Sequence, residues 1–475
     1  MEERPKIPVP LPVDNPTQSY WQDPPDPIAD IHTTESLPAS ADTVIIGSGI
    51  TGAAVAWDLL QRKAEDARKN QTIVMLEARQ TCSGATGRNG GHTKAASYRT
   101  FPHHASTLGL PAAVQIARLE LANILAVHEF ARHHNIDCDL CPCDTIDVIY
   151  DVQQWEEAQA AVALMRETLG ENNPVAKYTV LSPEEVKANF YCHDHTYHGR
   201  EQKVYGGVVY FAGSLSAYKF TIGVIKLCLE RGLNLQTSTP ALELMKDDTN
   251  GRWTVRTPRG EIKARRVVLA TNGYTASILP QKFQGVVVPV RGQIEAHRPG
   301  AKLPMGGCLP TTYSFIYEGG GFEYMIPRPK GSKNEGDIIM GGGLLRAPEG
   351  GLMEVGEADD AAISQEISEY LTETTPNYFG EEWGEDDKEG RVRKEWTGVM
   401  GFGPDGFPFV GEVPDEKGLW VSSCFQGHGM VLCWKSAEGL VEMMEERDGE
   451  GLREWFPDAF RISEERLGKK FRGIL

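Results

Sequence analysis

The segment VIIGSGITGAAVA, residues 44–56, constrains the fold of this chain more than any other. An apolar run of the kind that forms a buried strand leads into Gly47, Gly49 and Gly52, and apolar residues with helical spacing follow. In such a unit the first glycine permits a tight turn, the second lets a pyrophosphate approach the backbone, and the third lets helix pack on strand. The pattern predicts a dinucleotide-binding βαβ unit.

The next strand, QTIVMLEA, ends at Glu77, 25 residues past Gly52. A carboxylate at that point accepts hydrogen bonds from a ribose 2′-hydroxyl and repels a 2′-phosphate, so the pattern favours FAD or NAD over NADP. The helix N-terminus offers unpaired N–H groups to the phosphates. The structural alternative is a glycine turn that binds no ligand. The cofactor-binding residues predicted in this unit are Gly47, Gly49, Ile50, Thr51, Gly52, Glu77, Ala78 and Arg79.

A second glycine cluster, ATGRNGGH at residues 85–92, helps to distinguish FAD from NAD, the two cofactors that remain. Its glycines allow the main chain to run along a long dinucleotide, while Arg88 and Asn89 engage phosphate oxygens or fix the loop. A nicotinamide enzyme has no need for this cluster together with a remote glycine turn at 427–430, so the pattern favours FAD. The further predicted cofactor-binding residues are Ser83, Gly84, Ala85, Thr86, Gly87, Arg88, Asn89, Gly90, Gly91, His92, Ala241, Thr271, Asn272, Gly273, Gly427, His428, Gly429 and Met430.

The order of the apolar patterns predicts two interleaved domains. The βαβ pattern gives way to helices at 111–135 and 153–169, returns from Ser214, and closes with a strand, glycine turn and helix at 418–447. A second strand-rich block ends in an amphipathic helix near 361–374. We expect an N-terminal arm at 1–37, a dinucleotide-binding domain at 38–110, 204–285 and 396–475, and a substrate domain at 111–203 and 286–395.

Five motifs together resemble one family, the D-amino-acid-oxidase-like FAD-dependent amine and amino-acid oxidoreductases. They are GSGITGAAVA with Glu77, CSGATGRNGGH, PVRGQ, GFGPDGFPFVGEVP and GHGM, and they span residues 41–439 in the family's order. The RNGGH variant and the GGG strand most resemble its gamma-glutamylputrescine-oxidoreductase-like branch. The N-terminal arm lies outside the match.

The resemblance implies an α/β fold in which an FAD-binding Rossmann-type, glutathione-reductase-like domain is interleaved with an α+β substrate domain on a mixed antiparallel sheet. It implies oxidation of a C–N bond by hydride transfer to flavin N5. Molecular oxygen is the family's usual acceptor and gives peroxide. A small amine or amino-acid-like molecule is therefore the expected substrate.

Four residues are candidates for the active site: His92, His428, Arg291 and Tyr324. His428 begins the last helix, whose N-terminus would face the flavin N1 and C2 carbonyl; the alternative is a histidine that only caps that helix. His92 is an active-site polar group, an attachment point for the flavin 8α carbon as in some relatives, or a structural residue. Arg291 binds a substrate anion or anchors its loop. Tyr324, with Arg328 nearby, lines the pocket or packs within a strand.

One departure from the family bears on the substrate. Glycine-oxidase-like members often carry an arginine for the substrate carboxylate just before the segment that corresponds to GFGPDGFPFVGEVP. This chain has WTGVM there, and Met400 cannot make a bidentate contact with a carboxylate. The sequence therefore favours an amine, a polyamine derivative or an N-substituted amino acid over a simple α-amino acid.

Charge and cysteine content bear on partners and location. The 48 Lys and Arg against 66 Asp and Glu give a formal charge of −18, which argues against nucleic acid or an anionic membrane as the main partner. No stretch approaches the roughly 18 to 20 uninterrupted apolar residues of a membrane span. The N-terminus lacks the apolar core of a secretory signal, RGIL is no peroxisomal address, and nine cysteines, an odd number, fit reduced thiols. We expect a cytoplasmic protein.

No metal site is expected, because CDLCPC at 138–143 lacks a second CxxC and YCHDHTYHG at 191–199 is typical of a loop. Two alternatives to an amine oxidoreductase stay open. A flavin monooxygenase should carry a later GD-containing flavin segment, but Gly336-Asp337 lies in an unsuitable turn. The other is a protein that binds FAD without catalysis.

Overall fold

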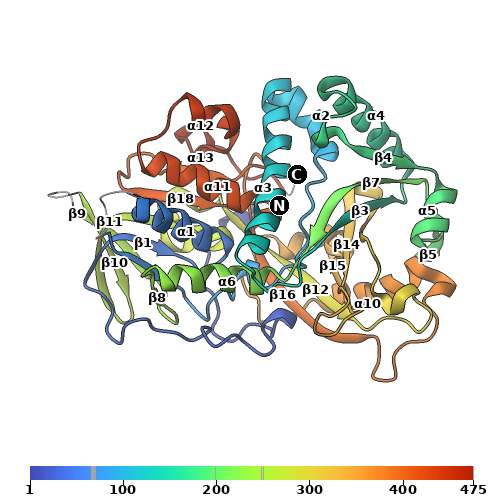
Figure 1. Cartoon of the computed structure of the whole chain (residues 1–475), viewed down its shortest axis with the longest axis horizontal. Coiled ribbons are helices and arrows are strands. Elements are labelled where there is room, and N and C mark those ends of the chain that lie inside the picture. The colour runs from blue at the N-terminus through green and yellow to red at the C-terminus, as the bar shows by residue number, and fades with distance from the viewer. Residues whose placement is uncertain (66–70, 198, 248, 250, 474–475) are drawn as a thin grey trace.

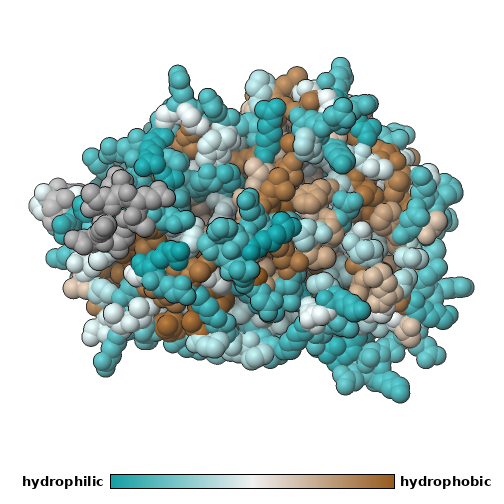
Figure 2. Space-filling model, viewed as in Figure 1, coloured by the Kyte–Doolittle hydropathy of each residue, from teal (hydrophilic) through white to brown (hydrophobic). Residues whose placement is uncertain are grey.

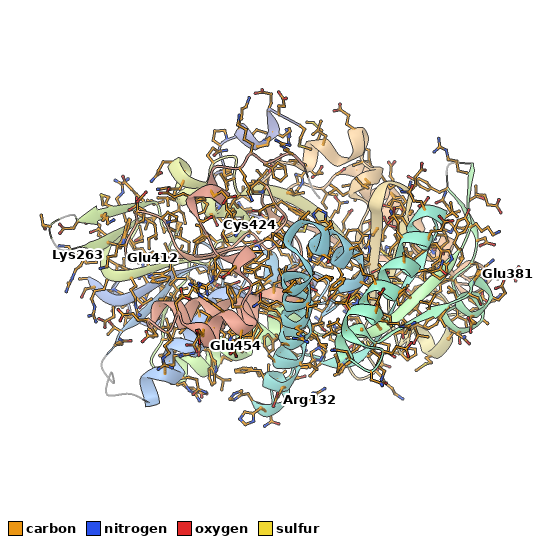
Figure 3. All side chains as sticks on the ribbon, turned by 90° about the horizontal axis from the view of Figure 1, so that it is seen from above. Arg132, Lys263, Glu381, Glu412, Cys424 and Glu454 are labelled. Carbon is orange, nitrogen blue, oxygen red and sulfur yellow. The ribbon has the colours of Figure 1, made fainter. Side chains whose placement is uncertain are left out.

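Two sheets of eight strands lie side by side in the computed structural model of the chain, which describes residues 1–65, 71–197, 199–247, 249 and 251–473. The first sheet occupies the left half of Figure 1 and the second the right half, with helix α3 running between them. Seen from above in Figure 3, Lys263 of the first sheet and Glu381, in the half of the molecule that holds the second sheet, lie at opposite ends of the long axis. Cys424 lies between them.

The first sheet has the order β17-β18-β11-β1-β2-β8, with β10 and β9 added beside β11. Strands β18, β11, β1, β2 and β8 are parallel neighbours, as the buried apolar runs predict. The strands are β1 (Ser40–Ile46), β2 (Ile73–Leu76), β8 (Asn234–Gln236), β9 (Glu243–Asp247), β10 (Arg252–Thr257), β11 (Gly260–Leu269), β17 (Phe409–Glu412) and β18 (Leu419–Ser423).

The second sheet has the order β16-β12-β15-β14-β13-β3-β7-β4 and is antiparallel except where β13 runs parallel to β3. Its strands are β3 (Cys141–Ile149), β4 (Tyr178–Leu181), β7 (Gly206–Ser214), β12 (Val288–His297), β13 (Thr312–Tyr317), β14 (Gly321–Pro327), β15 (Ile338–Gly342) and β16 (Val392–Phe402). A separate hairpin pairs β5 (His195–Tyr197) with β6 (Arg200–Gln202). The α/β class and the mixed antiparallel second sheet are confirmed.

Helices cover both sheets. They are α1 (Ile50–Glu65), α2 (Ser97–Leu108), α3 (Leu110–His133), α4 (Val152–Leu169), α5 (Pro183–Phe190), α6 (Ala217–Glu230), α7 (Thr275–Ile278), α8 (Pro280–Phe283), α9 (Pro348–Gly351), α10 (Gln365–Phe379), α11 (Gly429–Met444), α12 (Glu450–Trp455) and α13 (Glu464–Leu467). The largest apolar cluster packs α1, α3, α6 and α11 against one face of the first sheet. A second cluster fills the other face, and a third lies between the second sheet and α10.

Helix α3 is long and apolar enough to cross a membrane, with a mean hydropathy of 1.4 over its most apolar window, of which 44% is buried. A single helix of this kind is weak evidence for a membrane span, because core helices of soluble proteins meet the same criterion. Here α3 packs against α2 and α11. The surface along the middle of the molecule shows brown apolar patches broken up by teal polar groups in Figure 2.

The predicted elements and domain boundaries can be compared with these strands. Helices α3 and α4 match the predicted segments at 111–135 and 153–169, whereas α10 begins later than residue 361 and ends later than 374. Strands β7 and β16 pair in the second sheet, although the boundaries at 204 and 396 assign β7 and most of β16 to the dinucleotide-binding domain. Neither segment carries a local sign of which sheet it joins.

Three predicted features fall partly outside the described residues. They are residues 66–70, at the end of the helix expected after Gly52; His198, in the loop expected at 191–199; and positions 248 and 250, where the segment DDTNGR predicts a hairpin turn.

Candidate cofactor and active site

Four parallel strands of the first sheet end at the same edge, and each is followed by one of the predicted cofactor-binding segments. Strand β1 leads into Gly47, β2 into Glu77, β11 into the turn at 271–273, and β18 into the turn at 424–430. Ligands of open α/β sheets bind at this carboxyl edge of parallel strands. The fold therefore gathers four segments that lie up to several hundred residues apart in sequence.

The turn after β1 can hold only glycine at two positions. Gly47 has a φ of +108°, and a Cβ there would lie 2.5 Å from the carbonyl oxygen of Ala270. A Cβ on Gly52 would lie 2.0 Å from the carbonyl oxygen of Gly47, so the start of α1 packs directly on the turn. The turn thus leaves the backbone at the N-terminus of α1 without a covering side chain at Gly47 and Gly49, and N–H groups there favour an anion.

Glu77 joins this turn to the end of β2. Its carboxylate accepts hydrogen bonds from the Ser48 hydroxyl at 2.6 Å, the Ser48 N–H at 3.1 Å and the Arg79 N–H at 3.0 Å. A carboxylate has about four acceptor sites, so one remains for a ribose hydroxyl. Thr239 N–H donates to the carbonyl of Glu77, which places Ala241 two residues beyond this contact. The donor set fits an adenosine ribose.

The loop at 83–87 packs against the N-terminus of α1. The Ile50 N–H donates to Thr86 Oγ1 at 3.1 Å, and a Cβ on Gly49 would lie 3.0 Å from the same oxygen. Ser83 is only 4% exposed, and its hydroxyl has no hydrogen-bond partner among the described residues. A buried hydroxyl without a partner is costly, so this one fits a cofactor that supplies the missing bond.

Arg88 fixes its loop to three other parts of the chain, which is the second of its two predicted roles. The guanidinium donates to the carbonyls of Ser83 (2.9 Å), Thr397 (2.7 Å) and Thr17 (2.6 Å), and its Nε lies 3.3 Å from Asp360. Burial lowers the pKa of Arg88 to about 10. The hydrogen-bond donors of Arg88 contact protein groups. These described contacts do not leave the guanidinium free for a phosphate.

Arg79 pairs with the same carboxylate. Both of its terminal nitrogens lie 2.9 Å from Asp360, which is 1% exposed, and they also donate to the carbonyls of Val13 and Ser83. Sequence reasoning did not identify Asp360, because it lies far away in an acidic loop without a motif. We refer to Arg79, Arg88 and Asp360 as the arginine cluster.

The N-terminal arm lies against the second glycine loop. The Ser19 hydroxyl donates to the Gly87 carbonyl at 2.6 Å, and the Trp21 indole N–H donates to the Asn89 carbonyl at 2.6 Å. The Asn89 side chain accepts a bond from the Gly91 N–H at 2.7 Å. Asn89 therefore shapes the loop internally, while the arm holds it from outside.

His92 lies where the glycine loop reaches the second sheet. It forms an isolated bridge with Ser214 at the end of β7, and its Nε2 shares a hydrogen bond of 2.7 Å with Thr312 Oγ1 at the start of β13. Burial, and then the charge of Lys94, lower the pKa of His92 well below its usual value. The imidazole is neutral at pH 7.

A buried charge cluster beside His92 was missed by sequence reasoning. The Lys94 ammonium donates to Asp147 and to Ser314, and Asp147 also accepts from Tyr98 at 2.7 Å and Tyr210 at 3.0 Å. Asp147 is fully buried in β3. Burial lowers the pKa of Lys94. One signal was present: an aspartate inside the apolar run TIDVIY requires a buried partner.

His428 lies in the closing turn before α11. It occupies the N-cap position, but its side chain makes no capping hydrogen bond; instead Nδ1 donates to the Gln426 carbonyl at 2.8 Å. Its ring reaches solvent, yet the surrounding protein lowers its pKa by burial, and the charges of Arg99 and Lys94 lower it further. Of the two predicted roles, simple capping of the helix does not agree with these contacts.

Strand β16 brings the two glycine turns together. A Cβ on Gly398 would lie 3.1 Å from the Cβ of Arg88, and Met400, two residues along, lies 3.4 Å from the Cβ position of Gly427. The Asn272 side chain accepts from the Phe425 N–H at 3.3 Å, which ties the turn after β11 to the same place. The three glycine turns thus surround one region, as a single extended dinucleotide requires.

The other two predicted catalytic residues are engaged within the protein. Arg291 pairs with Glu354 at 2.7 Å and donates to the Asp359 carbonyl at 3.1 Å, which are contacts of its loop-anchoring alternative. The Tyr324 ring occupies the space left by two glycines, since a Cβ would lie 2.4 Å from it on Gly90 and 2.2 Å on Gly341. Tyr324 therefore packs directly on the second glycine loop.

Arg328, which the sequence placed near Tyr324, forms a 2.7 Å ion pair with Asp139. In the histidine-containing segment at 191–199, His193 lies 2.9 Å from Glu382. Within the described part of the chain, no three His, Cys, Asp or Glu side chains gather as metal ligands would.

Comparison with known proteins identifies the family. A model of the family described as FAD dependent oxidoreductase (DAO) matches residues 42–443. The chain is 24% identical to a probable oxidoreductase OrdL of Rhizobium meliloti over 82% of this chain and 80% of that protein. It is 26% identical to a glycine oxidase of Pseudomonas aeruginosa over 41% of this chain, and spans 45% of that relative's length.

The fold matches solved structures as well. The crystal structure of glycine oxidase from Geobacillus kaustophilus superposes with a TM-score of 0.67 at 18% identity, covering 90% of this chain and 99% of that one. At this identity the likeness concerns the fold, whereas the family match extends over most of the sequence. Together with the Glu77 and Ser83 geometry, which fits FAD, these matches place the chain in the DAO family of FAD-dependent oxidoreductases.

Proposed function

We propose that the chain oxidises a C–N bond of an amine or an N-substituted amino acid, with molecular oxygen as acceptor and peroxide as product. When bound, FAD supplies the chemistry by accepting hydride at its N5 atom. The observation that carries the proposal is the meeting of the two sheets. The carboxyl edge of the first, which fits FAD, adjoins the end of the second that His92 and Lys94 contact.

The protein's own groups have three tasks in such a reaction. The N-terminus of α11, preceded by Gly427 with φ +75°, presents backbone N–H groups toward the region that the three turns surround. His92 and His428 both have lowered pKa values, so neither adds positive charge there at pH 7. Burial and the nearby charges of Lys94 and Arg99, which keep both imidazoles uncharged, also favour the uncharged amine, which is the form that gives up hydride.

Paired arginines support an amine over a simple α-amino acid. Arg79 and Arg88 pair with Asp360, and Arg291 pairs with Glu354, so these guanidinium groups are already neutralised. Met400 lies beside Gly427, where relatives often carry a carboxylate-binding arginine. A substrate carboxylate would need another cation.

Arg99 is the other cation that a substrate carboxylate would need, and it supports an N-substituted amino acid as the substrate. It lies near enough to His428 and Lys94 for its charge to lower both pKa values. No described salt bridge contains Arg99, and its guanidinium lies 5.8 Å over the Phe322 ring. It is placed to accept a carboxylate that a plain amine lacks.

The experiment is a peroxide assay of purified protein over a panel of amines, N-substituted amino acids and α-amino acids. Acid precipitation of the same sample shows whether the flavin stays with the protein, which tests covalent attachment at His92. We expect peroxide with amines or N-substituted amino acids. Bleaching of the flavin by NADH instead would support the monooxygenase alternative, and flavin without any turnover would support a non-catalytic FAD-binding protein.

We further propose that the three ranges 38–110, 204–285 and 396–475 hold most of the FAD and that 111–203 and 286–395 form most of the substrate pocket. Cytoplasmic location is also a proposal. The free state of the nine cysteines supports it, since reducing compartments keep thiols unpaired.

A further inference from the structure

A pocket lies on the face of the second sheet that is turned away from the candidate active site. Side chains of strand β13 point to alternate faces of the sheet. Thr312, at the start of the strand, bonds to His92. Tyr317, at its end, has the opposite orientation, belongs to the apolar cluster beside α10 and forms one wall of the pocket. The pocket is therefore separate from the site that fits FAD.

Three segments meet at this pocket: the hairpin of β5 and β6, the short turn after β15, and helix α10 (Figure 1). Ring contacts join the hairpin to the helix. The ring centre of Tyr197 in β5 lies 5.1 Å from that of Tyr370 in α10. The ring centres of His195 and Tyr378 lie 5.2 Å apart. His195 and Tyr197 are only partly buried, so a small ion reaches the pocket from solvent.

Arg346 supplies the positive charge of the pocket. Its guanidinium carbon lies 3.8 Å from the ring centre of Tyr317 and 4.6 Å from that of Tyr197, so the group packs against tyrosine rings. Its buried Nε–H has no hydrogen-bond partner among the described residues. An unpaired buried donor of a charged group costs more than an unpaired neutral one. The Nε–H of Arg346 therefore indicates an acceptor that the described side chains do not supply.

The carboxylate nearby is held by other groups. Glu323 is fully buried, and its charge acts on Arg346. Its carboxylate accepts from the hydroxyls of Tyr317 at 2.6 Å and Tyr378 at 2.7 Å. The Gly343 N–H donates to it as well, at 3.3 Å. Burial raises the pKa of Glu323, which makes its negative charge easier to lose. The hydrogen bonds of Glu323 thus go to these donors and not to the Nε–H of Arg346.

The free space in the pocket limits what it holds. The centre of a water-sized group has about 10 Å³ available, which is enough for about one water molecule or one ion of similar size. An amine substrate is too large for this space. A second cation is disfavoured, because Arg346 already lies over the tyrosine faces. Size and charge together favour a small anion.

We propose that this pocket binds one small monovalent anion of the size of a halide. The Nε–H of Arg346 donates to the anion, and the bound charge neutralises the guanidinium where the three segments meet. An ion that binds only the folded chain stabilises it, so binding raises the thermal midpoint. The site requires neither substrate nor turnover, and it is therefore independent of the proposed function.

A bromide titration tests the proposal in solution. Bromide replaces gluconate, a monovalent anion too large for the pocket, at constant ionic strength, and scanning fluorimetry follows the thermal midpoint of the FAD-loaded protein. We expect a rise that saturates with bromide concentration. Arg346→Met removes the charged hydrogen bond and should weaken bromide affinity about 10- to 100-fold. The control is Arg256→Met, which breaks an exposed ion pair with Glu243 and should keep the wild-type response.

A crystal of the FAD-loaded wild-type protein, soaked in bromide, gives a second result that does not depend on the folding of a variant. We expect an anomalous scattering peak within hydrogen-bond distance of Arg346 Nε. The proposal is overturned if that position holds only water, or if the wild-type protein and Arg346→Met respond alike to bromide. A peak without saturable stabilisation in solution would mark an adventitious ion only, and would overturn it too.

Discussion

The two sides of the candidate site are built by different means. On the first-sheet side, the backbone turns after β1, β2, β11 and β18 carry the site, and glycines decide how closely chains approach. On the second-sheet side, side chains from distant strands carry it, as in the cluster of Lys94 with Asp147. The comparison teaches that glycine turns can be recognised in the local sequence, whereas a buried charge cluster is assembled only by the fold.

The largest expected effect comes from breaking the arginine cluster that joins the two sides. Asp360→Ala leaves Arg79 and Arg88 buried without a counter-charge, which costs about 3–5 kcal/mol. We expect a lower thermal midpoint and loss of flavin, measured by scanning fluorimetry and absorbance. The control is Glu3→Gln, which breaks an exposed pair with Lys6 and should change neither. Retention of wild-type stability by Asp360→Ala would show that the cluster is not a structural link.

A smaller effect is expected from a single added methyl on the first-sheet side. Gly52→Ala places a Cβ 2.0 Å from the Gly47 carbonyl oxygen, so the turn must shift, at a cost of about 1–3 kcal/mol. FAD affinity, measured by flavin fluorescence on reconstitution, should fall. Gly451→Ala is the matched control, since no atom lies within 4 Å of its Cβ position. Equal FAD affinity in both variants would mean that the turn does not approach the cofactor.

On the second-sheet side, Arg99→Met should raise KM for some substrates and not for others, rather than abolish activity. Losing a charged hydrogen bond of about 1.5–3 kcal/mol raises KM about 10- to 100-fold for substrates that carry a carboxylate. Plain amines should keep their KM. Steady-state kinetics with a matched pair, one amine and its N-carboxyalkyl derivative, measures this. An equal loss for both would remove Arg99 from substrate recognition.

The smallest expected effect on FAD affinity comes from a change in the N-terminal arm. Trp21→Phe removes the 2.6 Å hydrogen bond to the Asn89 carbonyl and keeps an aromatic ring. Loss of one such bond costs about 1 kcal/mol, or about fivefold in FAD affinity. Tyr20→Phe serves as the control, because its hydroxyl bonds to Asp337 and not to the glycine loop. If both variants bind FAD alike, the arm does not position the loop.

Prediction from the sequence was most successful where the geometry depends on residues that are close together in the chain. The βαβ unit, the position of Glu77 at the end of β2 and the gathering of three glycine turns follow from local patterns and from the rule that parallel strands end together. The family assignment and FAD as cofactor are confirmed.

Sequence reasoning could not identify pairings across the fold. Nothing local indicates that Arg79 and Arg88 share Asp360, that Arg291 pairs with Glu354, or that the arm's Trp21 binds Asn89. These partners lie on separate segments, and their contact depends on how two sheets pack. For the same reason the boundaries expected at 204 and 396 carry no indication that β7 and β16 pair in the second sheet.

The central claim is that both sides face one bound FAD, and anaerobic titration tests it most directly. Protein loaded with equimolar FAD is mixed with an active amine in the absence of oxygen. The absorbance of the oxidised flavin, at about 450 nm, is then followed. The account predicts uptake of FAD and bleaching by the amine, with colour restored by air. A chain that takes up no FAD, or whose bound flavin no amine bleaches, would contradict it.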